Sequence, residues 1–325
     1  MKILGVTRKA GVTALGAIAL LIAPLSSATA RTGSAADTID PSTRANVIKS
    51  IKGEAFAYAK YRAYAAQAEI EQLPEVQALY ERTATTEFRE HLTELANLIG
   101  LVGGNAANLR DTISGESYEA ATMYKQFAEQ ARADGDSNAA ELFTEIGNDE
   151  AKHSGQFAQA LKAITQPSSG ATIPAEAEAK STSIPAGKPK VSSPRTLHNL
   201  QTAMQGEAYA HAKYTLYAEH ARTTGQPDLG TLFDSIARIE LTEHFAEEAT
   251  LAGLVGDTKT NLCETISTET YEGEQMYPSY ARQAAAVGDQ TAAALLTDTG
   301  NDELAHARAF TDAFSALGKQ CPTPS

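Results

Sequence analysis

Acidic residues and histidines recur at helical spacing along this chain of 325 residues. Glu150 and His153 lie three positions apart, between the apolar residues Ile146 and Phe157. Residues three or four positions apart share one face of a helix, and an apolar stripe at this spacing marks the face that packs in a core. A single Glu-x-x-His is more typical of a solvated helix face, but one such element on each of four helices would indicate a buried metal site.

Three preceding segments interrupt their apolar stripes in the same way. Several ionised carboxylates inside a helical bundle would repel one another and lose their hydration, and a pair of divalent cations compensates for both. Four helices that supply Glu and Glu-x-x-His elements are the pattern of dinuclear iron or manganese bundles. The candidate ligands on these three segments are Glu54, Glu87, Glu90, Glu116 and Glu119.

The whole arrangement occurs twice. The segment GEAFAYAKYRAYA begins at Gly53, and GEAYAHAKYTLYA begins at Gly206, 153 positions later. The pairs LVGG and LVGD, and GNDEAKH and GNDELAH, keep this offset, so the chain is a tandem duplication. The second copy supplies the equivalent candidate ligands Glu207, Glu240, Glu243, Glu269, Glu272, Glu303 and His306.

Four helices per copy would position these residues. In the first copy we expect them near residues 44–71, 75–99, 108–134 and 137–164. No segment alternates with period two, so the prediction is an all-α chain of two tandem ferritin-like four-helix bundles joined by a flexible linker. The predicted organisation is a signal peptide at 1–30, a flexible lead-in at 31–43, domain one at 44–165, a Pro/Ser/Ala-rich linker at 166–196, domain two at 197–318 and a tail at 319–325.

The N-terminus has the features of a secretory signal. Lys2, Arg8 and Lys9 precede an apolar stretch, and Ala28-Thr29-Ala30 supplies the small residues of a cleavage site. The apolar stretch is shorter than a membrane span, so we expect export to the periplasm or the exterior with no stable membrane anchor after cleavage. The net charge of −13 argues against a nucleic-acid partner.

Export gives the two cysteines a structural interpretation. Cys263 opens the third helix of the second copy, and Cys321 follows the fourth. These helix ends are close in a ferritin-like bundle, and an oxidising compartment permits disulfides, so we predict a Cys263–Cys321 bridge. The alternative is two free thiols. Two cysteines are too few for an iron–sulfur cluster.

Both copies resemble the ferritin-like domain of rubrerythrins. The resemblance lies in Glu54-Ala55, Glu116-Ser117-Tyr118-Glu119 and Glu150-Ala151-Lys152-His153, and in their second-copy equivalents. It implies two irons per domain, with manganese as the alternative metal, and a reaction with peroxide or dioxygen as oxidant. It also implies that a set of tyrosines lies beside the ligand carboxylates, where their buried hydroxyls need a partner: Tyr61, Tyr124, Tyr214 and Tyr277.

Two departures from the family pattern bear on these expectations. The chain has no paired C-x-x-C motifs of a rubredoxin-like module, so its electrons must come from an external donor that the sequence does not identify. The family's second helix carries Glu-x-x-His, whereas this chain has EFREH from Glu87 and ELTEH from Glu240. The histidine is one position late, so we predict that the second glutamates, Glu90 and Glu243, are ligands. His91 and His244 would be ligands only if a π-bulge rotated them inward.

Two functions follow from these features. The first is a di-iron oxidoreductase, either a non-haem peroxide reductase or a ferrous-iron oxidase, in defence against oxidative stress. The second is a protein that sequesters iron or another divalent metal without turnover. The two domains could form a pseudo-dimer within one chain, or the chain a homodimer.

Overall fold

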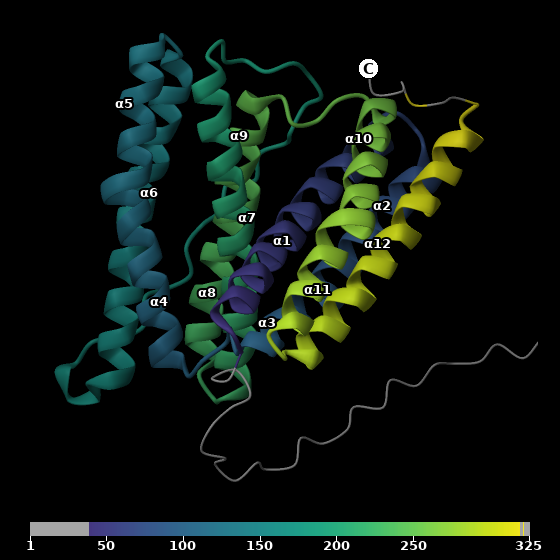
Figure 1. Ribbon diagram of the computed structural model, residues 1–325. Helices are drawn as coiled ribbons and strands as arrows, with labels where there is room; N and C mark the ends of the chain where they lie inside the picture. Colours follow the sequence, from purple (N-terminus) through teal and green to yellow (C-terminus); the bar gives the residue numbers. More distant parts are fainter. Residues whose placement is uncertain (1–38, 319–320, 322–325) are drawn as a thin grey trace, which may run out of the picture. The chain divides into compact units, whose positions relative to one another are not determined.

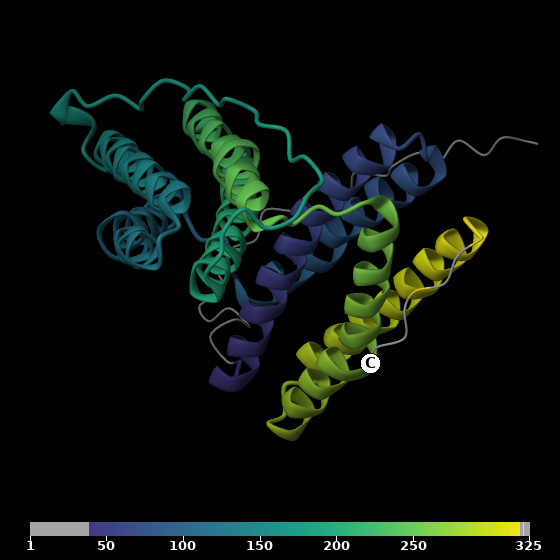
Figure 2. The same cartoon turned by 90° about the horizontal axis from the view of Figure 1, so that it is seen from above.

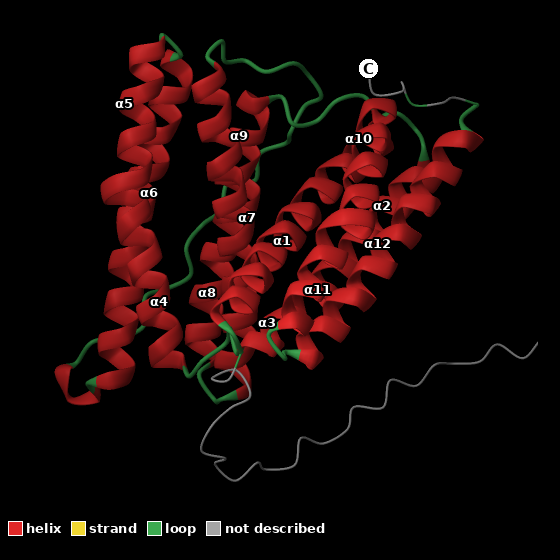
Figure 3. Ribbon diagram, in the orientation of Figure 1, coloured by secondary structure: helices red, strands yellow, loops and turns green. Residues whose placement is uncertain are grey.

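The computed structural model describes residues 39–318 and residue 321. Within this part of the chain the regular structure is helical and contains no strand (Figure 3). The predicted signal peptide lies outside the described residues, as do most of the lead-in and most of the tail. No described helix is both long enough and apolar enough to cross a membrane.

The helices of the first copy begin and end within three residues of their predicted limits. The second and third are each interrupted by a π-helical turn, so each appears as three consecutive elements. They are α1 (Pro41–Ile70), α2 (Pro74–Thr86), η2 (Glu87–Leu92), α3 (Thr93–Ile99), α4 (Asn105–Tyr118), η3 (Glu119–Met123), α5 (Tyr124–Asp134) and α6 (Ser137–Thr165).

The second copy repeats this order, including the two π-helical turns. A short 3-10 helix, η4 (Pro167–Ser169), precedes it in the linker. Its elements are α7 (Pro194–Thr223), α8 (Pro227–Ile239), η5 (Glu240–His244), α9 (Phe245–Ala252), α10 (Thr258–Tyr271), η6 (Glu272–Met276), α11 (Tyr277–Ala286) and α12 (Gln290–Ala316).

The two four-helix bundles do not coincide with the two copies. Helices α1–α3 of the first copy pack with α10–α12 of the second, and we call this group bundle A (Figures 1 and 2). Helices α4–α6 of the first copy pack with α7–α9 of the second, and we call this group bundle B. The predicted domains 44–165 and 197–318 are therefore the two sequence repeats, and each repeat gives one helical hairpin to each bundle.

The short connection after α3 explains this exchange. The second and third helices of bundle A run parallel, because Tyr80 bonds Thr265 near their beginnings and the carboxylates of Glu87 and Glu269 meet further along both. A direct link between parallel helices must cover a helix length, about 39 Å for 26 residues. The connection at residues 100–104 spans at most about 20 Å. It can therefore only lead into the other bundle, and residues 253–257 lead back in the same way.

The linker, predicted to be flexible, follows a defined path along bundle B. It runs in extended conformation along α8, η5 and α9. Backbone amides of the linker donate to carbonyls in η5, in α9 and in the loop after α9: Thr182 to Thr242, Lys190 to Leu251 and Gly187 to Val255. At its end, the backbone amides of Ser192 and Ser193 donate to Asp136. Proline suits such a segment, because it has no backbone amide that would need a helical partner.

Candidate dinuclear metal sites

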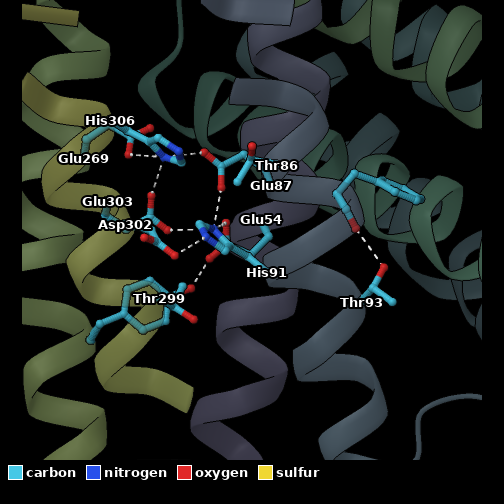
Figure 4. A network of polar contacts seen from close by, with 12 residues as sticks. Glu54, Thr86, Glu87, His91, Thr93, Glu269, Thr299, Asp302, Glu303 and His306 are labelled. Atoms are coloured by element: carbon cyan, nitrogen blue, oxygen red, sulfur yellow. Dashed lines mark hydrogen bonds and ion pairs between the residues drawn. The ribbon is translucent and has the colours of Figure 1, made fainter. Parts of the chain in front are cut away.

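Bundle A holds a cluster of carboxylates and imidazoles at its centre, which we call site A. Every helix of the bundle contributes to it, and its four carboxylates are at most 3% exposed. In Figure 4 the two imidazoles lie on opposite sides of the cluster and face shared carboxylates. The residues of site A are Glu54 on α1, Glu87 and His91 on η2, Glu269 on α10, and Glu303 and His306 on α12.

Site A divides into two overlapping groups of four ligands. One group is Glu54, Glu87, His91 and Glu303, and the other is Glu87, Glu269, Glu303 and His306. Within each group the potential ligand atoms all lie within 4.8 Å of one another. Because Glu87 and Glu303 belong to both groups, their carboxylates are placed to bridge two metal ions.

The imidazoles face the bridging carboxylates with the same nitrogen. His91 Nδ1 lies 2.8 Å from Glu87 Oε2 and 3.2 Å from Glu303 Oε1. His306 Nδ1 lies 3.2 Å from Glu87 Oε1 and 3.1 Å from Glu303 Oε2. Each histidine would therefore bind one metal, with both carboxylates between the two.

Bundle B holds the equivalent cluster, site B. Its two overlapping groups share Glu150 and Glu240, the equivalents of Glu303 and Glu87. His244 Nδ1 lies 2.9 Å from Glu240 Oε2, and His153 Nδ1 lies 3.0 Å from Glu150 Oε2. The residues of site B are Glu116, Glu150, His153, Glu207, Glu240 and His244.

Histidines, not the predicted glutamates, complete both sites on the second helix. Glu90 is exposed, and neither it nor Glu243 belongs to a ligand group. The π-helical turns η2 and η5 begin at Glu87 and Glu240, and a π-turn accommodates one residue more than an α-turn. The fifth residue of EFREH and ELTEH is thereby brought to the position that the fourth would have in an α-helix. The prediction for Glu90 and Glu243 is corrected, and the alternative based on a π-bulge describes the structure.

The π-turn also shifts the rest of the second helix. Beyond the turn the buried residues are His91, Leu95 and Ile99. A continuous α-helix from Glu87 would instead turn Glu90, Glu94 and Leu98 inward. The third helix shifts in the same way at η3, beyond which Tyr124 is buried and Met123 only partly buried. The inward positions beyond these turns are therefore displaced by one residue from those of a continuous α-helix.

The third-helix glutamates that begin η3 and η6 lie beside the sites without joining the ligand groups. Glu119 and Glu272, both predicted as ligands, are half-buried. Burial, together with the charges of Glu150 and Glu240, raises the pKa of Glu119 to about 8. Burial, with the charge of Glu54 as the next cause, raises the pKa of Glu272 well above its usual range. The charges of the ligand carboxylates therefore act on both of these carboxyl groups.

The four predicted tyrosines all contact ligand carboxylates, and every pair joins the two copies. Their hydroxyls are completely buried, and each donates a hydrogen bond to a ligand group of its bundle. In bundle A, Tyr61 donates to Glu269 and Tyr277 to Glu54; in bundle B, Tyr214 donates to Glu116 and Tyr124 to Glu207. The approach of the tyrosine helix needs glycine on the fourth helix, because a Cβ at Gly300 would lie 2.8 Å from Tyr277 Cβ.

The protein groups alone leave the sites electrostatically unbalanced. Burial raises the pKa of Glu54 to about 7, against the opposing hydrogen bond with His91. Burial also disfavours the charged form of Glu87, but its close contacts with the imidazoles of His306 and His91 outweigh burial and lower the pKa of Glu87 to about 2. Several buried site atoms have no hydrogen-bond partner: Glu87 Oε1, Glu116 Oε2, Glu150 Oε1, Glu240 Oε1 and Oε2, Glu269 Oε2, Glu303 Oε1 and both ring nitrogens of His244. Buried polar atoms need partners, and divalent cations bound by these oxygens and imidazoles would supply them.

Three residues near the sites were not predicted. Asp302 Oδ2 lies 3.5 Å from His91 Nε2, and Asp149 Oδ2 lies 3.9 Å from His244 Nε2, so a carboxylate faces the outer nitrogen of each histidine. Such partners orient metal-binding imidazoles. Their signal is the Asp before the Glu in the GNDE motif of each copy. The third, Glu248, is completely buried beside Tyr124 and has no counterpart in the first copy.

Comparison with known proteins agrees with this geometry. The sequence model of the family described as Rubrerythrin matches residues 46–162, 107–182 and 198–314. The chain belongs to the rubrerythrin family. Rubrerythrins bind di-iron centres, and sites A and B supply carboxylate and histidine clusters that can hold such metals. The match at 107–182 begins on the hairpin that the first copy contributes to bundle B.

Individual rubrerythrin relatives each match about one copy of the repeat. Nigerythrin of Nitratidesulfovibrio vulgaris is 31% identical over 135 residues, which cover 38% of this chain and 67% of the relative. Rubrerythrin-2 of Clostridium acetobutylicum is 32% identical over 127 residues, 35% of this chain and 69% of the relative. Symerythrin of Cyanophora paradoxa is 27% identical over 146 residues, 36% of this chain and 81% of the relative. No solved structure gives a significant match.

Proposed function

We propose that this rubrerythrin-family chain reduces peroxide at two di-iron centres, one in each bundle. The observation that carries the proposal is the arrangement of Glu87 and Glu303 in site A, and of Glu240 and Glu150 in site B. Each pair of carboxylates lies between two imidazoles and belongs to both ligand groups of its site, so it could bridge two metal ions. We therefore expect two irons per bundle and four per chain.

The chemistry requires both electrons and protons. Reduction of hydrogen peroxide breaks the O–O bond and forms two waters, which takes two electrons and two protons. If the carboxylates and histidines of a site hold two ferrous ions, these would supply the two electrons. The protein has titratable groups at hand for the protons, since burial raises the pKa of both Glu119 and Glu272, beside sites B and A respectively.

The tyrosines have a defined part in this proposal. Each phenol proton is held against a ligand carboxylate, as Tyr277 is against Glu54. A hydrogen bond to the charged form of a carboxylate stabilises that form, so each tyrosine favours the ionised state of its buried ligand against the effect of burial. It also fixes the carboxylate oxygen that remains free for the metal.

The surroundings of the reaction are part of the proposal. The sequence contains no C-x-x-C pair of a rubredoxin-like module, and we propose that an external donor delivers the electrons. The signal-like N-terminus supports export, which would place the reaction outside the cytoplasm.

Stopped-flow oxidation tests the proposed reaction. Protein loaded anaerobically with ferrous iron is mixed with hydrogen peroxide or with dioxygen at equal concentration, and the absorbance of the oxidised centre is followed. We expect peroxide to react faster. The matched control is the variant E150A/H153A/E303A/H306A, which loses ligands from both sites and should show no such signal. Faster oxidation by dioxygen would favour a ferrous-iron oxidase, and no oxidation by either would favour metal sequestration.

A further inference from the structure

The two sites differ at one buried position next to a tyrosine. On the second helix of each bundle, four residues after the histidine ligand, site B has Glu248 and site A has Leu95. Both side chains are completely buried. The other ligand and tyrosine positions described above carry the same residue type in both copies.

Glu248 contacts the tyrosine that holds a ligand of site B. Its Oε1 lies 3.0 Å from the hydroxyl of Tyr124, and the same hydroxyl donates to the ligand Glu207. The second oxygen of Glu248 is buried and has no hydrogen-bond partner. In bundle A, Tyr277 has the equivalent bond to Glu54, and an apolar Leu95 stands at the position of the second acceptor.

The number of protons determines the state of this group. A phenol has one proton, so Tyr124 can donate to only one of the two carboxyls that contact it. Glu207 is a metal ligand and must be ionised to bind. If Glu248 were also ionised, its negative charge would face the lone pairs of the phenol oxygen, and no cation would be bonded to Glu248. This arrangement is repulsive. A proton on Glu248 removes the conflict, because Glu248 then donates to Tyr124, which donates to Glu207.

The surroundings of Glu248 agree with a neutral acid. Burial raises its pKa well above the usual range, against the opposing hydrogen bond with Tyr124. Among the charged groups that act on it, His244 on η5 lowers its pKa, whereas Glu150 on α6 and Glu119 on η3 raise it.

We propose that Glu248, a neutral carboxylic acid acting through Tyr124 on Glu207, gives site B a higher reduction potential than site A. Linked hydrogen bonds strengthen one another, so a phenol that accepts from Glu248 donates more strongly to Glu207. That stronger bond withdraws electron density from the ligand carboxylate, which then stabilises the oxidised, more highly charged metal less. Glu248 is thus a positioning residue, and the chain carries two inequivalent centres. The proposal rests on iron binding at these sites and does not depend on which oxidant reacts.

Single-site proteins allow the potentials to be measured separately. E303A/H306A removes ligands of site A and leaves site B, whereas E150A/H153A does the reverse. Spectroelectrochemical titration of the iron-loaded proteins should give a higher midpoint for site B than for site A. In the site-B protein, E248L reproduces the residue of site A and should lower the midpoint towards that of site A. Equal midpoints for the two sites, or no change on E248L, would overturn the proposal.

Two further measurements separate this role from a structural one. In a Y124F background E248L should leave the midpoint unchanged, because the connection to Glu207 is already cut; an equal shift there would contradict action through Tyr124. Infrared difference spectra between manganese-loaded wild type and E248Q should show that the variant has lost one protonated-carboxyl band. If no such band is lost, Glu248 is not a neutral acid. This readout needs no turnover, so it distinguishes failure of the inference from failure of the proposed peroxide reaction.

Discussion

Tyr277 donates a hydrogen bond to Glu54, a residue 223 positions earlier in the chain. The bond joins the C-terminal hairpin to the N-terminal one, and its equivalent in bundle B joins Tyr124 to Glu207. The contacts that complete each metal site are therefore contacts between the two copies. Neither repeat by itself contains a full set of ligands in one bundle.

Alanine substitutions on the second helix should distinguish its histidines from its glutamates. We expect H91A to remove an imidazole from site A and to lower iron binding there, because His91 is buried among carboxylates. E90A, the matched control one residue away, changes an exposed side chain and should bind iron like wild type. The measurement is iron content after anaerobic loading. Less iron in E90A than in H91A would show that Glu90, and not His91, faces the site, as a continuous α-helix would require.

Removal of one tyrosine hydroxyl should weaken the metal-free fold. Y61F leaves a buried oxygen of Glu269 without its donor, and such a loss costs about 1–3 kcal/mol. Urea denaturation of metal-free protein measures the free energy of unfolding. Y118F is the control, since Tyr118 is 57% exposed and should change it little. Equal stability of Y61F and wild type would contradict the assigned hydrogen bond.

Metal binding should release protons, and the affinity should rise with pH. Burial disfavours the charged form of His306, but close contacts with the carboxylates of Glu269, Glu303 and Glu87 outweigh it and raise the pKa of His306 to about 12. The metal-free site therefore holds an imidazolium at neutral pH, whereas a metal binds neutral imidazole. Lower pH makes removal of that proton costlier and weakens binding. Calorimetry in buffers of different ionisation enthalpy counts the protons, and a count of zero would contradict this assignment.

The disulfide between Cys263 and Cys321 should stabilise bundle A. The bridge fixes the chain after α12 to the beginning of α10, with the two Cα atoms 5.5 Å apart. Closing a loop of 58 residues gives at most roughly 4 kcal/mol by chain entropy. We expect C263S/C321S to unfold at a lower urea concentration, with its free energy of unfolding reduced by up to this amount. Two reactive thiols in unfolded, unreduced wild type would show that the bridge does not form in solution.

The sequence was sufficient for the helices and for most ligands. Apolar residues at spacings of three and four predicted all four helices of each copy, and the acids within the stripes predicted Glu54, Glu150 and His153 as site residues. It was insufficient for the register beyond Glu87. An α-turn and a π-turn differ by one residue, and the side chains of EFREH are compatible with either. Only the burial of His91 in the packed bundle distinguishes them.

The pairing of hairpins could not be read from the ligands. Each ligand has an equivalent 153 positions away, so a bundle closed within one copy and a bundle formed by exchange would contain the same residue types. The length of one connection could have predicted the pairing, because residues 100–104 are too few to link parallel helices in one bundle. Glu248 was missed for a related reason, since the α-helical register assigned no inward position to the residue four after His244.

The exchange of hairpins is tested most directly by the iron content of two matched variants. Both contain E150A/H153A, which removes site B. Adding E207A/E240A changes two further ligands of site B, so about two irons per chain should remain in site A. Adding E54A/E87A instead changes ligands of site A, so iron content should fall to near zero. Two irons retained in the E54A/E87A variant and none in the E207A/E240A variant would show that each copy closes on itself and would contradict the exchanged bundles.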